Sequence, residues 1–189
     1  MIGAITAGLY AGGVPPVTNS YESIATVTLG SDTATITFSS IPSTYKHLQI
    51  RGIFRSSTGS AVDNLAFRLN GDTGANYATH TLIGNGSAAS AAAFTGNNFM
   101  YLPSASPDAA NASALFAGAV IDILDYANTS KNTTVRSLNG YDDNGATAYR
   151  RVQLSSGLWL NTAAVTSITF SNSGNLAAAT SFALYGIKG

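Results

Sequence analysis

Four short runs in the last third of the chain decide the fold: Phe116–Asp125 (FAGAVIDILD), Lys131–Tyr141 (KNTTVRSLNGY), Val165–Phe170 (VTSITF) and Ser181–Gly189 (SFALYGIKG). The runs have strand-like length and content, and turn residues separate each one from the next. No helical pattern intervenes, so they predict neighbouring strands of an antiparallel β-sandwich. None of the four runs carries a catalytic motif.

The composition supports an all-β fold and argues against several classes of function. Only 10% of the 189 residues are charged, and the formal net charge is +0, whereas about 25% of the residues in typical soluble domains are charged. A neutral chain lacks the field that attracts nucleic acid, so we expect no nucleic-acid partner. Cysteine is absent, which excludes disulfides and thiolate metal sites. No stretch approaches the roughly 18 apolar residues of a membrane-spanning helix, and we expect no membrane partner.

The chain after Tyr21 continues the strand pattern. Ser23–Leu29 and Thr33–Phe38 alternate apolar and polar residues around a Gly-Ser-Asp turn, which predicts a β-hairpin. Lys46–Ser56 predicts a strand whose alternate residues face opposite sides. One side of that strand holds Leu48, Ile50, Gly52 and Phe54.

Two later segments depart from simple alternation. Leu115–Tyr126 is almost continuously apolar, which is typical of a central strand covered on both faces. Ser87–Asn98 is built from small residues, and we expect a loop there. In total the pattern predicts roughly ten to twelve strands in one β-sandwich domain, over residues 21–189.

Residues 1–20 differ from this body and predict an extended N-terminal arm. Glycines interrupt their apolar residues, and a Pro-Pro step then favours an extended path. The segment is either a terminus that is disordered or packed on its own domain, or an arm that buries its apolar side chains on a neighbouring subunit. The second interpretation gives these candidate interface residues: Ile2, Ile5, Leu9, Tyr10, Pro15 and Pro16.

The sequence offers little chemistry for catalysis or metal binding. His47 and His80 belong to no metal-ligand spacing, and no Gly-x-Ser-x-Gly motif is present. Glycoside hydrolysis needs two carboxylates across a groove, but most of the acids fall in predicted turns. Asp122 and Asp125 end a predicted strand, where an arginine across the sheet could pair with them. We therefore expect no enzyme, no catalytic residue, no cofactor and no metal site.

Tyrosines near predicted strand ends raise one further alternative. Exposed rings there could contact a sugar or a protein, although tyrosine also favours strand edges without any such role. The tyrosines concerned are Tyr77, Tyr101, Tyr126, Tyr141 and Tyr149.

Longer phrases of the chain resemble a recurring β-domain of virion structural proteins from tailed bacteriophages. They are YKHLQIRG (45–52), FRLNGDTGANYATH (67–80), IDILDYANTSKNTTVRSLNGYD (121–142), SSGLWLNTAAVTSITF (155–170) and SFALYGIKG (181–189). The resemblance covers most of residues 21–189 and contains no catalytic motif. It implies a jelly-roll-like sandwich, commonly a trimer, that serves in capsid decoration (as a cement protein) or in head or tail fibres.

The function we expect from this resemblance is a capsid cement protein that binds the outside of the shell and stabilises contacts between capsomers. Its partners would be the major capsid protein and its own copies in a homotrimer, and its location would be the capsid surface. The alternative is a fibre or tail receptor-binding module whose loops, such as Ser87–Asn98 and Tyr141–Tyr149, contact a host glycan or protein. A compact domain without heptads or repeats fits decoration better than a fibre.

Overall fold

The computed structural model describes residues 20–59, 63–102, 114–144 and 150–189. Within these ranges the secondary structure consists of strands only, eleven in number, and every strand pairing is antiparallel. The strands are β1 (Tyr21–Thr28), β2 (Thr33–Phe38), β3 (His47–Phe54), β4 (Ala66–Leu69), β5 (Tyr77–Gly84), β6 (Ala89–Asn97), β7 (Ala117–Leu124), β8 (Thr133–Tyr141), β9 (Arg151–Trp159), β10 (Ile168–Leu176) and β11 (Ser181–Ile187). The predicted all-β sandwich is confirmed.

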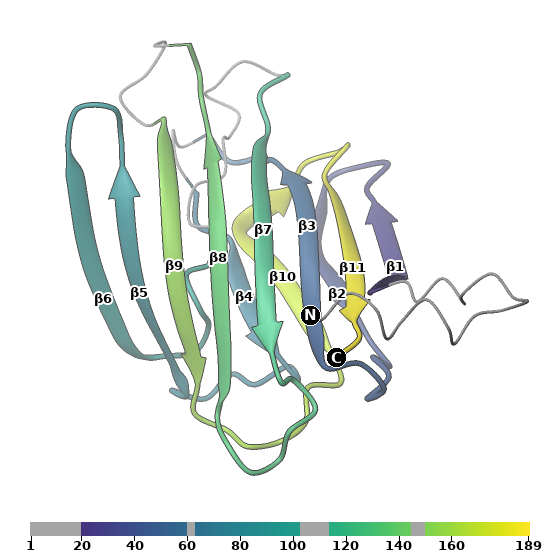
Figure 1. Ribbon diagram of the computed structural model, residues 1–189. Helices are drawn as coiled ribbons and strands as arrows, with labels where there is room; N and C mark the ends of the chain where they lie inside the picture. Colours follow the sequence, from purple (N-terminus) through teal and green to yellow (C-terminus); the bar gives the residue numbers. More distant parts are fainter. Residues whose placement is uncertain (1–19, 60–62, 103–113, 145–149) are drawn as a thin grey trace, which may run out of the picture.

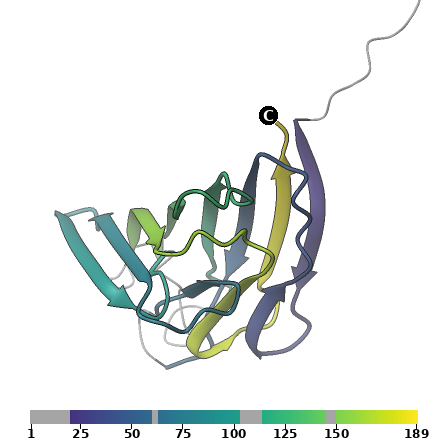
Figure 2. The ribbon, with the colours of Figure 1, turned by 90° about the horizontal axis from the view of Figure 1, so that it is seen from below.

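The strands form two layers of unequal size (Figures 1 and 2). The large sheet has eight strands in the order β1-β11-β3-β7-β8-β9-β5-β6, and the small sheet has three in the order β2-β10-β4. The small sheet packs against one face of the large one, so the other face of the large sheet points away from the sandwich. We call this second face the outer face.

An aromatic stack joins the two layers. Phe182 of β11 and Phe170 of β10 lie face to face, with ring centroids 4.3 Å apart and an interplanar angle of 7°. Phe54 extends the stack within the large sheet, at 5.7 Å from Phe182, and Phe67 extends it in the small sheet, at 5.3 Å from Phe170. All four rings are fully buried. Gly52 makes room for the stack, because a Cβ at this position would lie 2.4 Å from the Phe182 ring.

The predicted hairpin of Ser23–Leu29 with Thr33–Phe38 is wrong, although both segments are strands. β1 pairs with β11 in the large sheet, and β2 pairs with β10 in the small sheet. The connection between them crosses from one layer to the other beside the β10–β11 connection. Leu29 N–H donates to the Thr180 carbonyl over 2.9 Å, and Ala178 N–H donates to the Asp32 carboxylate over 3.0 Å. The β1–β2 connection is therefore hydrogen-bonded to the β10–β11 connection, and β1 and β2 do not pair with each other.

The predicted loop at Ser87–Asn98 is also wrong, because Ala89–Asn97 forms the edge strand β6. Its backbone pairs with β5 along most of its length. Side chains on β6 are exposed from Ala89 to Gly96. The strand buries no side chains there, so it can form from small residues without an alternating hydrophobic pattern. Backbone pairing here overrides a composition that favours loops.

The Asn70-Gly71 turn has positive φ at both residues, 52° and 66°, a conformation that an Asn-Gly pair favours. It leads into a partly buried corner. The Asp72 carboxylate accepts hydrogen bonds from Trp159 Nε1 over 2.7 Å, from Asn76 Nδ2 over 2.9 Å and from Gly74 N–H over 2.8 Å. These bonds, that of Trp159 above all, lower the pKa of Asp72. The phrase NGDTG is thus a structural corner that holds the only tryptophan.

Residues 1–19 of the predicted arm lie outside the described residues, and with them all six candidate interface residues: Ile2, Ile5, Leu9, Tyr10, Pro15 and Pro16. The chain enters the sheet at Ser20, whose carbonyl accepts a hydrogen bond from Lys188 N–H over 3.1 Å. In the ranges that the structure describes, no helix is long and apolar enough to cross a membrane.

Truncation of Phe182 to alanine should lower the free energy of unfolding by about 3–5 kcal/mol, because it removes the ring that joins the two layers and leaves a cavity. Phe94→Ala is the matched control, since Phe94 is partly exposed and stacks on Tyr101 at the sheet edge. Denaturant unfolding of both variants checks this. Equal losses for the two variants would contradict the role of the stack.

Candidate interaction surface

The outer face of the large sheet carries a continuous line of apolar side chains. Val120, Leu138, Leu154 and Leu82 are direct cross-strand partners on β7, β8, β9 and β5. These four side chains, which we call the apolar row, are between 38% and 54% exposed. Large apolar groups in contact with one another on a surface mark an interaction site more often than scattered ones do.

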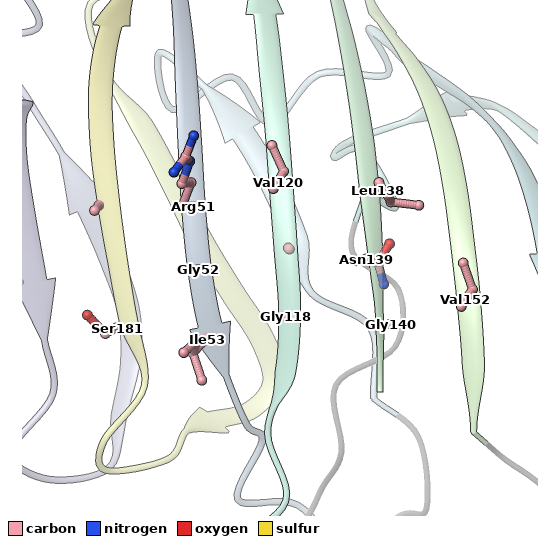
Figure 3. Close-up of a pocket in the computed structure, with 12 residues that line it drawn as sticks. Arg51, Gly52, Ile53, Gly118, Val120, Leu138, Asn139, Gly140, Val152 and Ser181 are labelled. Atoms are coloured by element: carbon pink, nitrogen blue, oxygen red, sulfur yellow. The ribbon is translucent and has the colours of Figure 1, made fainter. Parts of the chain in front are cut away.

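A hollow lies beside the apolar row, in the next row of cross-strand partners. Ile53, Gly118, Gly140 and Val152 follow one another across β3, β7, β8 and β9. The two glycines provide a low floor between the isoleucine and the valine, which are 58% and 61% exposed (Figure 3). The hollow has a volume of about 600 Å³. A Cβ added at Gly118 would meet no atom within 4 Å, so the floor there is open to the outside.

The expectation that Leu115–Tyr126 would be covered on both faces is therefore wrong for the described residues. β7 is a central strand, and its residues Ala117, Ala119, Ile121 and Ile123 are buried against the sandwich. Val120 and Gly118 instead lie on the exposed outer face. The sequence of this strand suits burial on both sides, whereas the isolated domain covers only one.

Polarity is inverted over part of β5, β8 and β9. Within Thr79–Leu82, Ser137–Asn139 and Val152–Ser155, the outward positions include Leu82, Leu138, Val152 and Leu154, while the buried inward positions hold Thr79, Thr81, Ser137, Asn139, Gln153 and Ser155. Toward the other end of these strands the pattern is the usual one, with Tyr77, Val135 and Trp159 buried and Arg136 and Ser156 exposed. Thr79, Thr81, Ser137 and Asn139 have no side-chain hydrogen-bond partner in the described part of the chain. A sheet that simply faced solvent would show the opposite pattern, with polar side chains outward. Over these stretches the outer face is the more apolar one.

Polar side chains border the apolar row: Gln49 and Asp122 lie in the next row of cross-strand partners, and Arg51 is the partner of Val120 at the end of the apolar row. Gln49 donates to the Asp122 carboxylate over 2.9 Å, and Arg51 Nε donates to Gln49 Oε1 over 3.0 Å. The Arg51 guanidinium also lies 5.8 Å from the Tyr185 ring and 5.9 Å from the Tyr21 ring, within cation–π range. An apolar centre with an ordered polar rim is the usual arrangement of a protein–protein interface.

The histidines take part in no catalytic arrangement. His47 Nδ1 accepts a hydrogen bond from Asp125 N–H over 2.9 Å, which fixes a turn. His80 lies opposite Ser156 on the outer face, and the next partner of Ser156 is Arg136, not a carboxylate. Among the described residues, no three side chains of the metal-binding types come close enough to hold an ion.

The suggestion of an aromatic surface at the strand ends is wrong for most of the tyrosines. Tyr77 and Tyr126 are fully buried, and Tyr141 is only 8% exposed. The Tyr77 hydroxyl bonds to Leu69 and Asp72 backbone atoms, and burial raises its pKa to about 12. Tyr149 lies outside the described residues. The Tyr77 and Tyr126 rings belong to the core, and their hydroxyls bond to backbone groups.

A second, smaller hollow of about 270 Å³ lies where the receptor-binding alternative would place its contacts. It is formed by Gly84–Gly86 of the β5–β6 turn and by Tyr141, Asp142, Arg150 and Arg151 at the ends of β8 and β9. Stacking on a sugar needs an exposed ring, and Tyr141 is nearly buried. The smaller hollow therefore lacks the exposed ring that would favour a glycan, whereas the larger hollow has a lining that suits an apolar group.

Asp125 is the centre of the strongest charge cluster. Lys131 and Lys46 form ion pairs with its carboxylate, and His47 Nδ1 lies 3.5 Å from it. The hydrogen bond from Lys131 and then that from Lys46 lower the pKa of Asp125 to about 2. The predicted cross-strand pairing of this acid with an arginine is thus replaced by two lysines. The cluster closes the β7–β8 turn.

Two glycines on opposite faces of neighbouring strands allow a matched test of this geometry. Gly118→Ala should leave the free energy of unfolding unchanged or raise it by up to about 1 kcal/mol, because glycine weakens a strand and the new methyl meets nothing. Gly52→Ala should lower it by about 1–3 kcal/mol, because its methyl overlaps the Phe182 ring. Denaturant unfolding measures both. A loss at Gly118 comparable with that at Gly52 would show that the outer face is already covered within the domain.

Asp125→Asn should destabilise the fold at neutral pH, and the difference from the wild type should shrink as pH falls. The folded-state pKa of about 2 lies below the ordinary 3.8, so the carboxylate stabilises the fold above pH 3.8 and loses this effect between pH 3.8 and about 2. Unfolding midpoints across this range check the trend. The same substitution in a Lys131→Met background should show a smaller difference, and an unchanged one would contradict the assigned cause.

No protein-family model, curated protein or solved structure matches this chain. The resemblance to virion proteins of tailed phages therefore stays a prediction.

Proposed function

We propose that this chain is a non-enzymatic structural protein of a virus particle, a capsid decoration protein that binds the outside of the shell and stabilises contacts between capsomers. Its partners on this proposal are the major capsid protein and other copies of the chain, in a trimer. The observation that carries the proposal is the apolar row of Val120, Leu138, Leu154 and Leu82 on the exposed outer face.

Such a face favours an assembly over a free monomer. Burial of apolar surface stabilises a protein by about 25 cal/mol per Å². Leucines that stay half exposed on neighbouring strands lack much of this stabilisation. The inverted polarity recurs at neighbouring positions of β5, β8 and β9, so this surface is not due to one stray residue. The low charge of the chain also gives little protection against association.

The chemistry of the larger hollow supports a contact role and not a catalytic one. Its lining consists mainly of glycine, aliphatic side chains and backbone, and Arg51 is the one charged residue among the described residues that line it. General acid–base or nucleophilic catalysis needs groups that give or take protons beside the substrate. A lining of this kind can bury an apolar group, but it lacks side chains that could give and take protons beside a substrate.

Repetition would make a modest contact effective on a shell. A standard interface buries roughly 1,600 Å² in total, and a symmetric particle repeats each interface many times. A subunit that touches several neighbours at once gains from effective concentration without any new contact. A compact, nearly neutral sandwich suits close packing of this kind.

The copy number of the chain in purified particles tests the proposal directly. Quantitative mass spectrometry against the major capsid protein should give a sizeable fraction of the capsid protein's copy number, because a decoration protein covers the shell. A number suited to a few vertices or one tail would favour the fibre or receptor-binding alternative. Absence from the particle would contradict any virion role.

Leu138→Lys should lower the amount of the protein that binds to particles, because it places a charge in the middle of the apolar row. The monomer should stay folded, since the side chain is half exposed. Thr35→Lys is the matched control, because Thr35 is exposed on the small sheet, on the opposite side of the sandwich. Co-sedimentation with particles that lack the protein measures binding. An equal loss of binding for both variants would show that the outer face is not the surface that binds the particle.

A further inference from the structure

The outer face is apolar and exposed, and the N-terminal segment of the chain is apolar and uncharged as well. We propose that the hollow and the apolar row bind the N-terminal segment Ile2–Tyr10 of a neighbouring copy of this chain. The inference rests on one part of the proposed function, that the protein works as an assembly of several copies. It does not depend on the capsid as the partner.

The two surfaces match in polarity. Residues 1–19 contain no charged side chain, and the apolar residues Ile2, Ile5, Leu9 and Tyr10 are spaced by small residues. The four side chains of the apolar row are likewise uncharged, and Arg51 beside them donates to Gln49 and lies over the Tyr185 ring. The segment would therefore bring no side-chain charge of its own to the contact, and burial of an unpaired charge is a main penalty for covering a protein surface.

The shapes also allow a close approach. Gly118 and Gly140 keep the floor of the hollow free of side chains, and Ile53 and Val152 stand on either side of it (Figure 3). A single isoleucine or leucine side chain fits easily in a volume of about 600 Å³. Gly3 and Gly8 in the segment let its backbone lie near the sheet without steric conflict.

The place where the chain leaves the sheet favours a neighbour's hollow over the chain's own. Tyr21 shares a row with Ile187 and His47, at the end of β3 opposite to Ile53. The hollow is six residues further along the strands, about 20 Å, and Gly118 lies three strands away, about 14 Å, which gives a separation of about 25 Å.

Residues 11–20 could span at most about 35 Å when fully extended. The direction of β1 carries the chain before Tyr21 away from its own hollow, so a return needs a reversal of about four residues. The remaining six span about 20 Å, so only residues before Tyr10 could lie in the middle of its own hollow, and only after the chain turns back on itself. Pro15-Pro16 further favours a straight path outward. A neighbouring copy can receive the segment without any reversal.

Disulfide trapping tests the contact, and the absence of native cysteine makes each introduced thiol unique. Chains with Ile5→Cys and chains with Val152→Cys are produced together with tags of different mass, purified and mildly oxidised. We expect a mixed disulfide dimer, identified by intact mass. Ile5→Cys paired with Thr35→Cys is the matched control and should give no mixed dimer above background. Equal trapping at Thr35 overturns the proposal.

A chain with both Ile5→Cys and Val152→Cys decides which copy is involved. The proposal predicts disulfides between chains, and a product linked within one chain overturns the neighbour assignment. Gly118→Leu fills the hollow from a position where a Cβ meets no atom within 4 Å. It should leave the unfolding midpoint unchanged and shift native mass from oligomer to monomer, as Ile5→Asp should.

Other occupants of the face appear as distinct outcomes of the same measurements. An oligomer that persists in Gly118→Leu and in Ile5→Asp means that whole sheets pack face to face, and this overturns the proposal. A wild type that is monomeric at all concentrations also overturns it. Both results concern purified protein alone, so neither affects the copy number in particles, which tests the proposed function separately.

Discussion

The stack of Phe170 on Phe182 is the contact on which the rest of the structure depends. It joins the only strand that lies between β1 and β3 to the central strand of the small sheet. Gly52 leaves the room that the Phe182 ring occupies, and Phe54 and Phe67 extend the contact into both layers. Because the small sheet has only three strands, this aromatic cluster supplies much of the apolar surface that holds it in place.

The unequal layers divide the large sheet into two regions of opposite polarity. Around β11, β3 and β7 the buried positions are aromatic and aliphatic, as in any sandwich. Around β8, β9 and β5 part of the buried positions hold hydroxyls and amides beside Tyr77, Val135 and Trp159, and the leucines of the apolar row point outward. The first region explains how the domain folds alone. The second has no explanation within the domain, and it becomes reasonable once the outer face is treated as an internal surface of a larger assembly.

The sequence predicts the fold class well and the outer face poorly, for separate physical reasons. Alternation in Lys46–Ser56 correctly places Leu48, Ile50 and Phe54 inward, because the β3 pattern matches its burial. Val152 and Leu154 also alternate with Gln153 and Ser155, but their pattern alone would assign them to the core. Strand register, which long-range pairing decides, turns them outward. Long-range pairing likewise decides which layer a strand joins after a short turn. For this reason the local pattern predicted a β1–β2 hairpin that the structure does not contain.

The position of β11 has a consequence for how the protein is made. β1 is the first strand of the sheet and β11 the last in sequence, yet β11 lies between β1 and β3 and carries Phe182. During synthesis β1 therefore has no partner in the large sheet until β11 has left the ribosome, and the two layers cannot close before then. A nascent chain must keep β1 from pairing wrongly for all of that time. A product cut short before Ser181 would lack both the strand and the ring, so it could not close the two layers.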